Sequence, residues 1–424
     1  MQPMRAPPER APPENAATAA ALSLLSAAAV RTRAHRMLAI GLDGALAHFR
    51  VELDRLDATV DLVLAVTRAA YPRLDAPFHS RWRHFRTGGE DRWTSLAAAT
   101  HWPDRASRAR TEVDLATVSV LLDAGAGPDW VYADPRTGRR IGRSEGLALA
   151  SLDMFAQGAF SARPGEPLRA DGDALARLPY ETLRQGFQVS NHNPLVGVDG
   201  RTDLLRRLGA VVTHAPHVFG RADDPRPGGL FDHLVEQARG GGIAAAAILS
   251  ALLHHLGSIW PSRLTLGGVA LGDCWPHPVL TSADATNGLM PLHKLSQWLA
   301  YSLIEPLQAA GLAVVDVDGL TGLAEYRNGG LFIDTGVLAL RRAQEAVRAH
   351  DISSTLVVEW RALTVALLDR LAERLRERIG TDALSLPLAK ILQGGTWAAG
   401  RKIAHERAAD GSPPLRVISD GTVF

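Results

Sequence analysis

The residues best suited to chemistry lie between His293 and Asp334, where charged side chains interrupt apolar sequence. Glu325, Arg327 and Asp334 stand there among Leu, Ala, Phe and Ile, and two adjacent glycines allow a ligand or another backbone to approach closely. A carboxylate and basic groups in apolar surroundings are typical of acid–base chemistry and of sites that stabilise a cationic intermediate. A structural Glu–Arg pair explains the same residues equally well.

A helix beginning near His293 is predicted to carry further side chains toward this segment. Lys294, Gln297 and Tyr301 stand at i, i+3 and i+7, so they share one face, and Trp298 borders it. Lysine is rare in the chain, because only three of the 46 basic residues are lysines. Since lysine, unlike arginine, readily shifts its pKa and loses a proton, Lys294 is the more interesting for having been retained.

A second candidate region is the run 78–85, which holds two arginines, two histidines and three aromatic residues. Guanidinium groups beside aromatic rings suit an anionic or sugar-like ligand such as a phosphate, which makes Arg81, Arg83 and His79 candidate binding residues. An interface in which the arginines stack on a tryptophan and cap helix carbonyls accounts for the run equally well. The sequence leaves His79 and His84 undecided between ligand contact and packing.

Residues of the types that bind metals are present, but they are not spaced as in a zinc-binding motif. Asp273, Cys274 and His277 lie near His293, and a histidine pair stands at 254–255, but the chain has neither a second cysteine nor a His-Glu-x-x-His arrangement. A buried cysteine with a hydrogen-bonded histidine is therefore favoured over a zinc site.

The sequence Gly142-Arg-Ser144-Glu-Gly146 matches the Gly-x-Ser-x-Gly pattern of a nucleophile elbow. Its lead-in is polar (Arg136-Thr-Gly-Arg-Arg-Ile141), whereas an elbow needs an apolar strand before the serine. A polar turn is the favoured interpretation of Ser144.

These residues must be positioned mainly by helices. Helical periodicity recurs over 38–70, 112–124, 173–185, 243–256, 293–310 and 356–379, with a first amphipathic helix over 19–30. Strand-like runs are short, at 312–316 and at 331–334, and the second of these alternatively begins a helix. We expect a disordered Pro/Ala-rich tail over 1–20 and one mainly α, mostly helical catalytic domain over 21–424.

Composition excludes several classes of protein. Hydrophobic residues make up 46% and charged residues 21%, and the net charge of +1 steers the chain toward neither nucleic acid nor an anionic membrane. The single cysteine excludes an internal disulfide and suits a reducing compartment. The apolar run 19–30 is too short and alanine-rich to span a bilayer, and its dense positive charge follows it, unlike that of a signal peptide. We expect a cytoplasmic protein that binds a small molecule. The protein partner that we consider is a second copy of the chain, in a homodimer.

Strings along the chain resemble those of the uracil catabolism protein 4 family of fungi and bacteria. They include FHSRWRHF at 78–85, LGDCWPHP at 271–278, HKLSQWL at 293–299, LTGLAEYRNGGLFIDTGVL at 320–338 and GGTWAAGR at 394–401. The resemblance implies a pathway in which uracil becomes its nucleotide and a relative of GTP cyclohydrolase II opens the pyrimidine ring. A ribosylurea-type intermediate must then be dismantled. The resemblance gives Ser144 no role as a nucleophile.

A second, shorter resemblance concerns the segments around Lys294 and Glu325. Lys294-Leu-Ser-Gln297 followed by Ala324-Glu325-Tyr-Arg327 is similar to the Lys-Arg-Ala-Gln and Ala-Asp-Tyr-Arg segments of queuosine 5′-phosphate N-glycosylase. That enzyme has an α-helical fold related to the helix-hairpin-helix DNA glycosylases and hydrolyses an N-ribosidic bond with this lysine and aspartate. The resemblance implies the lysine role for Lys294 and the aspartate role for Glu325, which is one methylene longer.

Together the resemblances imply an N-riboside hydrolase that cleaves ribosylurea or its 5′-phosphate to urea and ribose or ribose phosphate. Glu325 would stabilise the oxocarbenium-like state or direct a water, and Lys294 would assist the departing urea. No metal or redox cofactor is required. The expected substrate-binding residues are Arg327, Gln297, Asp334, Tyr301, Arg81, Arg83 and His79.

Two alternatives remain open. The first is a metal-assisted amidohydrolase acting on a ring-opened ureido acid, for which His254, His277, Cys274 or Asp273 must converge. The second is a non-catalytic partner protein, for which the Glu325 region should be a solvated ion pair.

Overall fold

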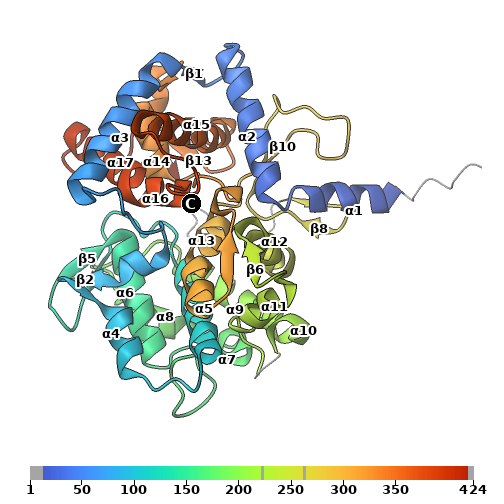
Figure 1. Ribbon diagram of the computed structural model, residues 1–424, viewed down its shortest axis with the longest axis vertical. Helices are drawn as coiled ribbons and strands as arrows, with labels where there is room; N and C mark the ends of the chain where they lie inside the picture. Colours follow the sequence, from blue (N-terminus) through green and yellow to red (C-terminus); the bar gives the residue numbers. More distant parts are fainter. Residues whose placement is uncertain (1–12, 221–223, 261–263, 419–424) are drawn as a thin grey trace, which may run out of the picture.

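The computed structural model describes residues 13–220, 224–260 and 264–418. Helices dominate this part of the chain, which confirms the expectation of a mainly α protein (Figure 1). The longer helices are α2 (Ala27–Leu42), α3 (Leu56–Ala70), α5 (Arg105–Leu121), α6 (Arg143–Ala156), α9 (Val198–His214), α12 (Ala245–Leu256), α13 (Lys294–Ala309), α15 (Thr355–Ile379) and α17 (Trp397–Arg407). The shorter ones are α1 (Pro13–Ser23), α4 (Arg92–Ala99), α7 (Gly172–Ala176), α8 (Tyr180–Gly186), α10 (Pro216–Phe219), α11 (Gly229–Gln237), α14 (Tyr326–Asp334) and α16 (Leu388–Ile391).

Short strands join the helices in pairs rather than in a continuous sheet. The antiparallel pairs in the described residues are β1 (Phe49–Val51) with β12 (Leu338–Leu340), β2 (Arg86–Thr87) with β3 (Glu90–Asp91), β4 (Val131–Ala133) with β5 (Arg140–Gly142), β7 (Thr265–Leu266) with β8 (Val269–Ala270), and β9 (Cys274–Pro276) with β10 (Leu289–Pro291). The parallel pairs are β6 (Gly242–Ala244) with β11 (Ala313–Val315), and β13 (Ala349–Asp351) with β14 (Arg416–Ile418).

Short helical turns complete the architecture. They are the 3₁₀ turns Leu53–Arg55, Arg81–Phe85, Gly257–Ile259, Val317–Gly319 and Ala343–Val347, and the π-helical turn Leu392–Thr396 that leads into α17.

Helix α15 is the longest element and lies against α2, α3 and α14, while α14 also packs on α17. Ser354 caps its first turn by accepting from the Val357 amide at 3.4 Å, and Gly380 ends it in the left-handed conformation with φ +70°. In Figure 1, α14, α15 and α17 lie in the upper half of the molecule and α4, α6 and α8 in the lower half. Helix α13, which begins at Lys294, packs on α5 and α12 and lies near the middle of the molecule in Figure 1.

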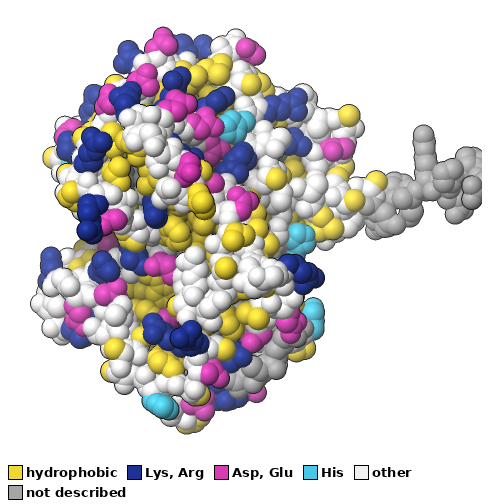
Figure 2. Space-filling view, viewed as in Figure 1, with side chains coloured by type: hydrophobic (Ala, Val, Ile, Leu, Met, Phe, Trp, Pro, Cys, Tyr) yellow, Lys and Arg dark blue, Asp and Glu magenta, His cyan; other side chains and the backbone are white. Residues whose placement is uncertain are grey.

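The surface agrees with the composition. Figure 2 shows Lys and Arg side chains interspersed with Asp and Glu over the visible face, without a broad area of one sign. Among the described helices, none has both the length and the apolar sequence needed to cross a membrane.

Several elements were predicted correctly and others were not. The helices predicted at 243–256, 293–310 and 356–379 are α12, α13 and α15 to within two residues at each end. The run 38–70 is divided, because α2 ends at Leu42 and a strand and a 3₁₀ turn precede α3. The strand interpretation of 331–334 was wrong, since these residues belong to α14.

The N-terminal predictions also need correction. Residues 1–12 of the expected tail lie outside the described residues, but α1 begins at Pro13, inside the segment expected to be disordered. The single helix expected over 19–30 is interrupted after Ser23, and Ser26 then caps α2 by accepting from the Ala29 amide at 3.2 Å.

Candidate active site

Glu325 is the N-cap residue of α14 and is held in one orientation. Its Oε1 accepts from the Asn328 amide and its Oε2 from the Arg327 amide, both at 2.6 Å. The side chain is only 8% exposed. Burial raises the pKa of Glu325, although the two backbone hydrogen bonds, Lys294 and Arg327 act in the opposite direction. Each carboxylate oxygen can still accept a second hydrogen bond, so Glu325 can cap its helix and contact a ligand at once.

Lys294 begins α13 and is held near Glu325 without touching it. Its ammonium makes no hydrogen bond or ion pair with any residue that the structure describes, and the side chain is half-buried. Burial lowers the pKa of Lys294, opposed first by Asp123 and then by Glu325. The amino end of a helix carries partial positive charge, which disfavours a cation further. This placement favours an ammonium that gives up a proton readily.

Arg361 of α15 connects the two helix starts. Its Nη1 and Nη2 each donate to the Asp273 carboxylate at 2.8 Å, and its Nε donates to the Ala324 carbonyl at 3.2 Å. Asp273 in turn accepts from the Lys294 amide at 2.9 Å and so fixes the first turn of α13. One guanidinium therefore sets Lys294 on one side and the residue before Glu325 on the other.

Asp273 is ionised in this arrangement. Burial alone would raise its pKa, but Arg361 and the hydrogen bonds from Lys294 and Trp275 outweigh burial and lower it to about 2. A charge-assisted fork of this kind is strong and directional, so Asp273 acts as a fixed anchor rather than as a free carboxylate.

Gln297 and Tyr301 share a face of α13 as predicted, but the structure directs both to Thr321. Gln297 Oε1 accepts from the Thr321 amide at 3.0 Å and its Nε2 donates to the Thr321 hydroxyl, while Tyr301 Oη donates to the Thr321 carbonyl at 2.9 Å. All three side chains are buried. These contacts hold the loop that leads into Glu325, so the two residues position the carboxylate.

Arg327 and the adjacent glycines are likewise occupied by the protein. Arg327 Nη1 donates to the Gly411 carbonyl at 2.8 Å, and its guanidinium lies 4.9 Å from the Tyr326 ring centroid. A Cβ on Gly329 would come within 2.6 Å of Trp360, so the close approach predicted there is made by another side chain of the chain itself. Within the described residues Glu325 pairs with no guanidinium, so the Glu–Arg ion pair and the solvated pair are both absent there.

Arg81 and Arg83 are engaged with carboxylates. Arg81 is fully buried, with Nη1 3.0 Å from Asp123 Oδ2, and Nε donates to Ser119 at 2.7 Å. Arg83 Nη2 donates to Glu305 of α13. A phosphate bound to this pair would have to displace a protein carboxylate.

His79 and His84 lie beside two tryptophans. The ring centroid of His79 is 4.5 Å from that of Trp298 and 6.4 Å from that of Trp397, and the corresponding distances for His84 are 5.7 and 6.0 Å. Burial lowers the pKa of His79 to about 3. The charge of Lys294 contributes to this lowering of the His79 pKa.

Ser144 lies in the first turn of α6 rather than in the polar turn that the sequence favoured. A short strand, β5, leads into it, and Arg143 has the left-handed φ of +58°. Its hydroxyl donates to Asp123 Oδ1 at 2.7 Å and lies 3.0 Å from His84 Nδ1.

Asp334 stands at the opposite end of α14 from Glu325. A helix of this length spans roughly 13 Å, so the structure does not bring Asp334 to the other candidates. Burial raises its pKa, with Arg407 and Arg327 opposing, and its Oδ2 is buried without a hydrogen bond in the described residues.

The residues of the alternative metal centre do not converge. Asp273 is bound to Arg361, Cys274 is buried among apolar side chains, and His277 lies 3.6 Å from Glu359. His254 is at the exposed end of α12 and bonds the Ser250 carbonyl at 2.7 Å. Across the described ranges no three His, Cys, Asp or Glu side chains are grouped as metal ligands.

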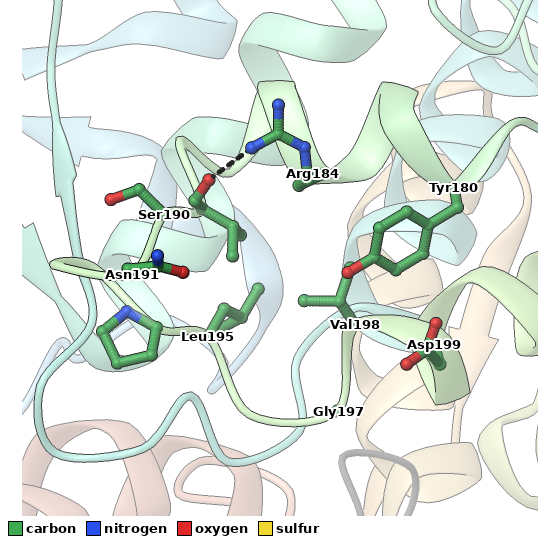
Figure 3. Close-up of a pocket in the computed structure, with 10 residues that line it drawn as sticks. Tyr180, Arg184, Ser190, Asn191, Leu195, Gly197, Val198 and Asp199 are labelled. Atoms are coloured by element: carbon green, nitrogen blue, oxygen red, sulfur yellow. Dashed lines mark hydrogen bonds between the residues drawn. The ribbon is translucent and has the colours of Figure 1, made fainter.

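An open cavity of about 530 Å³ lies elsewhere, between α8 and the start of α9 (Figure 3). Figure 3 shows Arg184 donating to the Val189 carbonyl, and the same guanidinium pairs with Glu181 at 2.6 Å. The guanidinium of Arg184 is thus already paired, and the cavity holds none of the predicted residues. Its lining consists of Tyr180, Arg184, Val189, Ser190, Asn191, Pro194, Leu195, Gly197, Val198 and Asp199.

Sequence reasoning missed Asp123 and Arg361 as members of this region. Arg361 is an arginine inside an otherwise apolar helix segment, and that is the signal from which a buried role was open to prediction. Asp123 follows α5 in a glycine-containing turn, and nothing local indicates its neighbours.

Comparisons with known proteins cover almost the whole chain. Residues 23–424 match the family model described as "Protein of unknown function (DUF1688)". The chain is 39% identical to protein urg3 of Schizosaccharomyces pombe over 412 residues, which are 95% of this chain and 98% of that protein. It is 36% identical to uracil catabolism protein 4 of Lachancea kluyveri over 416 residues, which are 90% of this chain and 93% of that protein. The resemblance to the uracil catabolism protein 4 family is thereby confirmed.

Proposed function

This chain belongs to the DUF1688 family, with urg3 and uracil catabolism protein 4 as relatives, and on that premise we propose that it acts in uracil catabolism as an N-riboside hydrolase. The substrate is ribosylurea or its 5′-phosphate, and the products are urea and ribose or ribose 5-phosphate. The likeness of the α13 and α14 starts to the queuosine 5′-phosphate N-glycosylase segments, and of the fold to that enzyme's helical fold, is part of this proposal.

The observation that carries the proposal is that Lys294 and Glu325 stand at two helix starts tied together by one guanidinium, and form no ion pair with each other in the described residues. Both are held at helix starts by the same residue, Arg361, through Asp273 and Ala324. An unpaired ammonium and a buried carboxylate cost stability, and contact would reduce that cost. Keeping them apart leaves room for a reacting group between an acid and a base.

The reaction balances with these two residues. The C1′–N bond breaks and its electron pair stays on the urea nitrogen, which takes a proton from the Lys294 ammonium. The carboxylate of Glu325 stabilises the positive charge that develops at C1′. A water adds to C1′ and gives its proton to Glu325, and transfer of that proton back to Lys294 restores the starting state. One water is consumed for each urea released.

The test is urea release by the purified full-length chain from ribosylurea, with and without a 5′-phosphate. Wild type should release urea from one of the two forms, and Glu325→Gln should not, while Glu373→Gln, at an exposed carboxylate on α15, serves as the matched control. Absence of urea from both substrates at high enzyme concentration would overturn the reaction. Unchanged turnover by folded Glu325→Gln would overturn the role of Glu325 and leave the reaction standing.

A further inference from the structure

Two buried histidines lie against Trp298, which follows Lys294 by about one turn of α13. Each uses one ring nitrogen within the protein and leaves the other unused among the described residues. His79 is 4% exposed and His84 is 8% exposed, and both rings lie against the rings of Trp298 and Trp397. We refer to these four residues as the histidine–tryptophan cluster. The pairing of each histidine fixes which of its nitrogens carries the proton.

The tautomer of His84 is set by Ser144. The Ser144 hydroxyl donates its one proton to Asp123 Oδ1 at 2.7 Å, and its oxygen lies 3.1 Å from Arg81 Nη1 and 3.0 Å from His84 Nδ1. Because Arg81 Nη1 is 3.5 Å from His84 Nδ1, the Ser144 oxygen is the nearer partner of the ring, and it accepts from Nδ1. Burial and the neighbouring Arg81 lower the pKa of His84, so the ring is neutral near pH 7. A neutral imidazole with its proton on Nδ1 presents an acceptor lone pair at Nε2.

His79 reaches the same state through a different partner. Its Nδ1 lies 2.8 Å from Gln393 Oε1, which can only accept, so Nδ1 carries the proton. Burial lowers its pKa to about 3, and the ring is neutral. Neither Nε2 of the pair forms a hydrogen bond with the residues that the structure describes, so the cluster holds two unused acceptors.

Two unused donors accompany these acceptors. Trp298 is 4% exposed, and its Nε1 is a buried donor without a partner among the described residues. Trp298 follows Lys294 by four positions, which puts the two side chains on one face of α13. The Lys294 ammonium is likewise without a hydrogen bond there. A buried N–H group without an acceptor is uncommon, and a ligand that supplies one accounts for it.

We propose that the histidine–tryptophan cluster recognises the ureido group of the substrate. His79 Nε2 and His84 Nε2 accept ureido N–H groups, Trp298 Nε1 donates to the ureido oxygen, and the Lys294 ammonium donates toward the departing nitrogen. A ureido group is planar, with N–H donors on one edge and a carbonyl on the other, so it matches two acceptors and two donors beside aromatic rings. The inference rests on the proposed function for its choice of ligand, and it assigns recognition of the leaving group to residues other than Glu325.

The experiment measures binding rather than turnover. N-Methylurea is titrated into the full-length chain by saturation-transfer NMR, and tetramethylurea, which keeps the carbonyl and lacks every N–H, is the matched ligand. We expect N-methylurea to bind and tetramethylurea to bind at least about tenfold more weakly, as the loss of buried hydrogen bonds predicts. Equal binding of the two ligands, or no binding of N-methylurea, would overturn the inference.

The variants separate acceptor loss from damage to the fold. His84→Asn keeps a donor toward Ser144 and removes the Nε2 acceptor, whereas His84→Gln offers an acceptor at the Nε2 position. We expect about tenfold weaker binding for His84→Asn and for His79→Asn, and nearly wild-type binding for His84→Gln. His254→Asn, the same change at an exposed histidine, should leave binding unchanged.

Further readouts keep the inference separate from the reaction. If His84→Asn fails to fold by circular dichroism, Trp298→Phe, which keeps the ring and loses Nε1–H, should also weaken binding about tenfold. Wild-type affinity in every folded variant of the cluster would overturn the inference even where urea is released from ribosylurea. Conversely, histidine-dependent binding of N-methylurea without urea release leaves the cluster as a ureido site and removes the proposed hydrolysis.

Discussion

Two groups of charged residues border the same loop, residues 316–325. The charges of one group form ion pairs, whereas those of the other do not. Around Asp369 each charge touches a partner: Arg31 Nε and His35 Nε2 both lie 2.9 Å from the Asp369 carboxylate, and Arg376 pairs with Asp318. These residues border a small cavity of about 220 Å³. We refer to Asp369, Arg31, His35, Arg376 and Asp318 as the Asp369 cluster, and it is an example of a structural charge network in this chain.

Around Lys294 and Glu325 the charges are buried but remain apart. Burial lowers the pKa of Lys294 and raises that of Glu325, so each is shifted toward its neutral form. In the Asp369 cluster the pKa shifts run the other way: burial opposes ionisation of Asp369, but His35 and Arg31 outweigh it and lower its pKa. Because this fold pairs the charges around Asp369, the unpaired charges of Lys294 and Glu325 require an explanation other than stability.

The largest expected effect is on turnover at Glu325. Glu325→Gln should lower kcat by on the order of 10³-fold, as expected when a charge that stabilises the transition state is removed. Glu325→Asp keeps a carboxylate and can still cap α14, so it should retain part of the activity. Steady-state urea release measures both, with circular dichroism as the folding control. A Glu325→Asp variant as inactive as Glu325→Gln would show that the longer side chain is required.

Arg361 should come next, because it positions both groups without contacting the substrate. Arg361→Lys keeps the charge but not the fork that holds Asp273 and the Ala324 carbonyl. We expect kcat to fall by about 10²-fold, the size typical of a misplaced catalytic group, while the affinity for N-methylurea changes little. Equal losses in kcat and in ligand affinity would instead indicate a general disturbance of the fold.

Replacing Lys294 should affect activity and stability in opposite directions. Lys294→Met should lower kcat by about 10²-fold through loss of the proton donor. The variant should also unfold at an equal or higher temperature, because a half-buried cation at a helix start is unfavourable by up to about 1 kcal/mol. Thermal melts beside urea assays test this, and a marked fall in melting temperature would contradict the comparison.

The pH range over which kcat/KM is high should be narrower than the ordinary pKa values of glutamate and lysine would give. Glu325 must be ionised and its pKa is raised, so the acid limb should lie above the ordinary glutamate value of about 4.3. Lys294 must be protonated and its pKa is lowered, so the alkaline limb should lie below the ordinary lysine value of about 10.4. Residual activity of Lys294→Met should lack the alkaline limb. An unchanged alkaline limb in that variant would assign it to another group.

The smallest effect on turnover is expected from the paired cluster. Asp369→Asn should leave urea release unchanged and lower stability by about 1 kcal/mol. Because the folded-state pKa of Asp369 is lowered, its pairing stabilises above the unfolded value of about 3.9 and is lost as pH falls through the folded value. Denaturant melts at pH 7 and below pH 3 should therefore differ between wild type and Asp369→Asn only at the higher pH.

The sequence predicted α13, the helix that carries Lys294, better than it predicted α14 or the surroundings of the candidate pair. Helix α13 follows a clear periodicity, and Lys294 and Glu325 stand out by type and spacing. The same periodicity put Gln297 and Tyr301 on one face correctly, but it does not say what that face meets, and both turned out to bind Thr321. The local sequence pattern determines on which face of a helix a side chain lies. Which distant residue that side chain contacts is determined by tertiary packing.

The contacts that escaped prediction join residues that are distant in sequence. Arg361 reaches Asp273 across 88 positions and Ala324 across 37, and His84 meets Ser144 across 60. The segment 331–334 was left open between a strand and the beginning of a helix, because four apolar-rich residues fit either element. The cap at Glu325 decides for the helix.

Because Arg361 must bridge Asp273 and Ala324, we expect the proposed urea-releasing activity to appear only late in folding. A ribosome that has passed Glu325 must still add 36 residues to reach Arg361 before the bridge to the Ala324 carbonyl can close. Lys294 and Glu325 therefore exist as an aligned pair only when α13, α14 and α15 have all docked. Recovery of urea release during refolding should then lag behind recovery of helix content, so the enzyme would report on its own complete assembly.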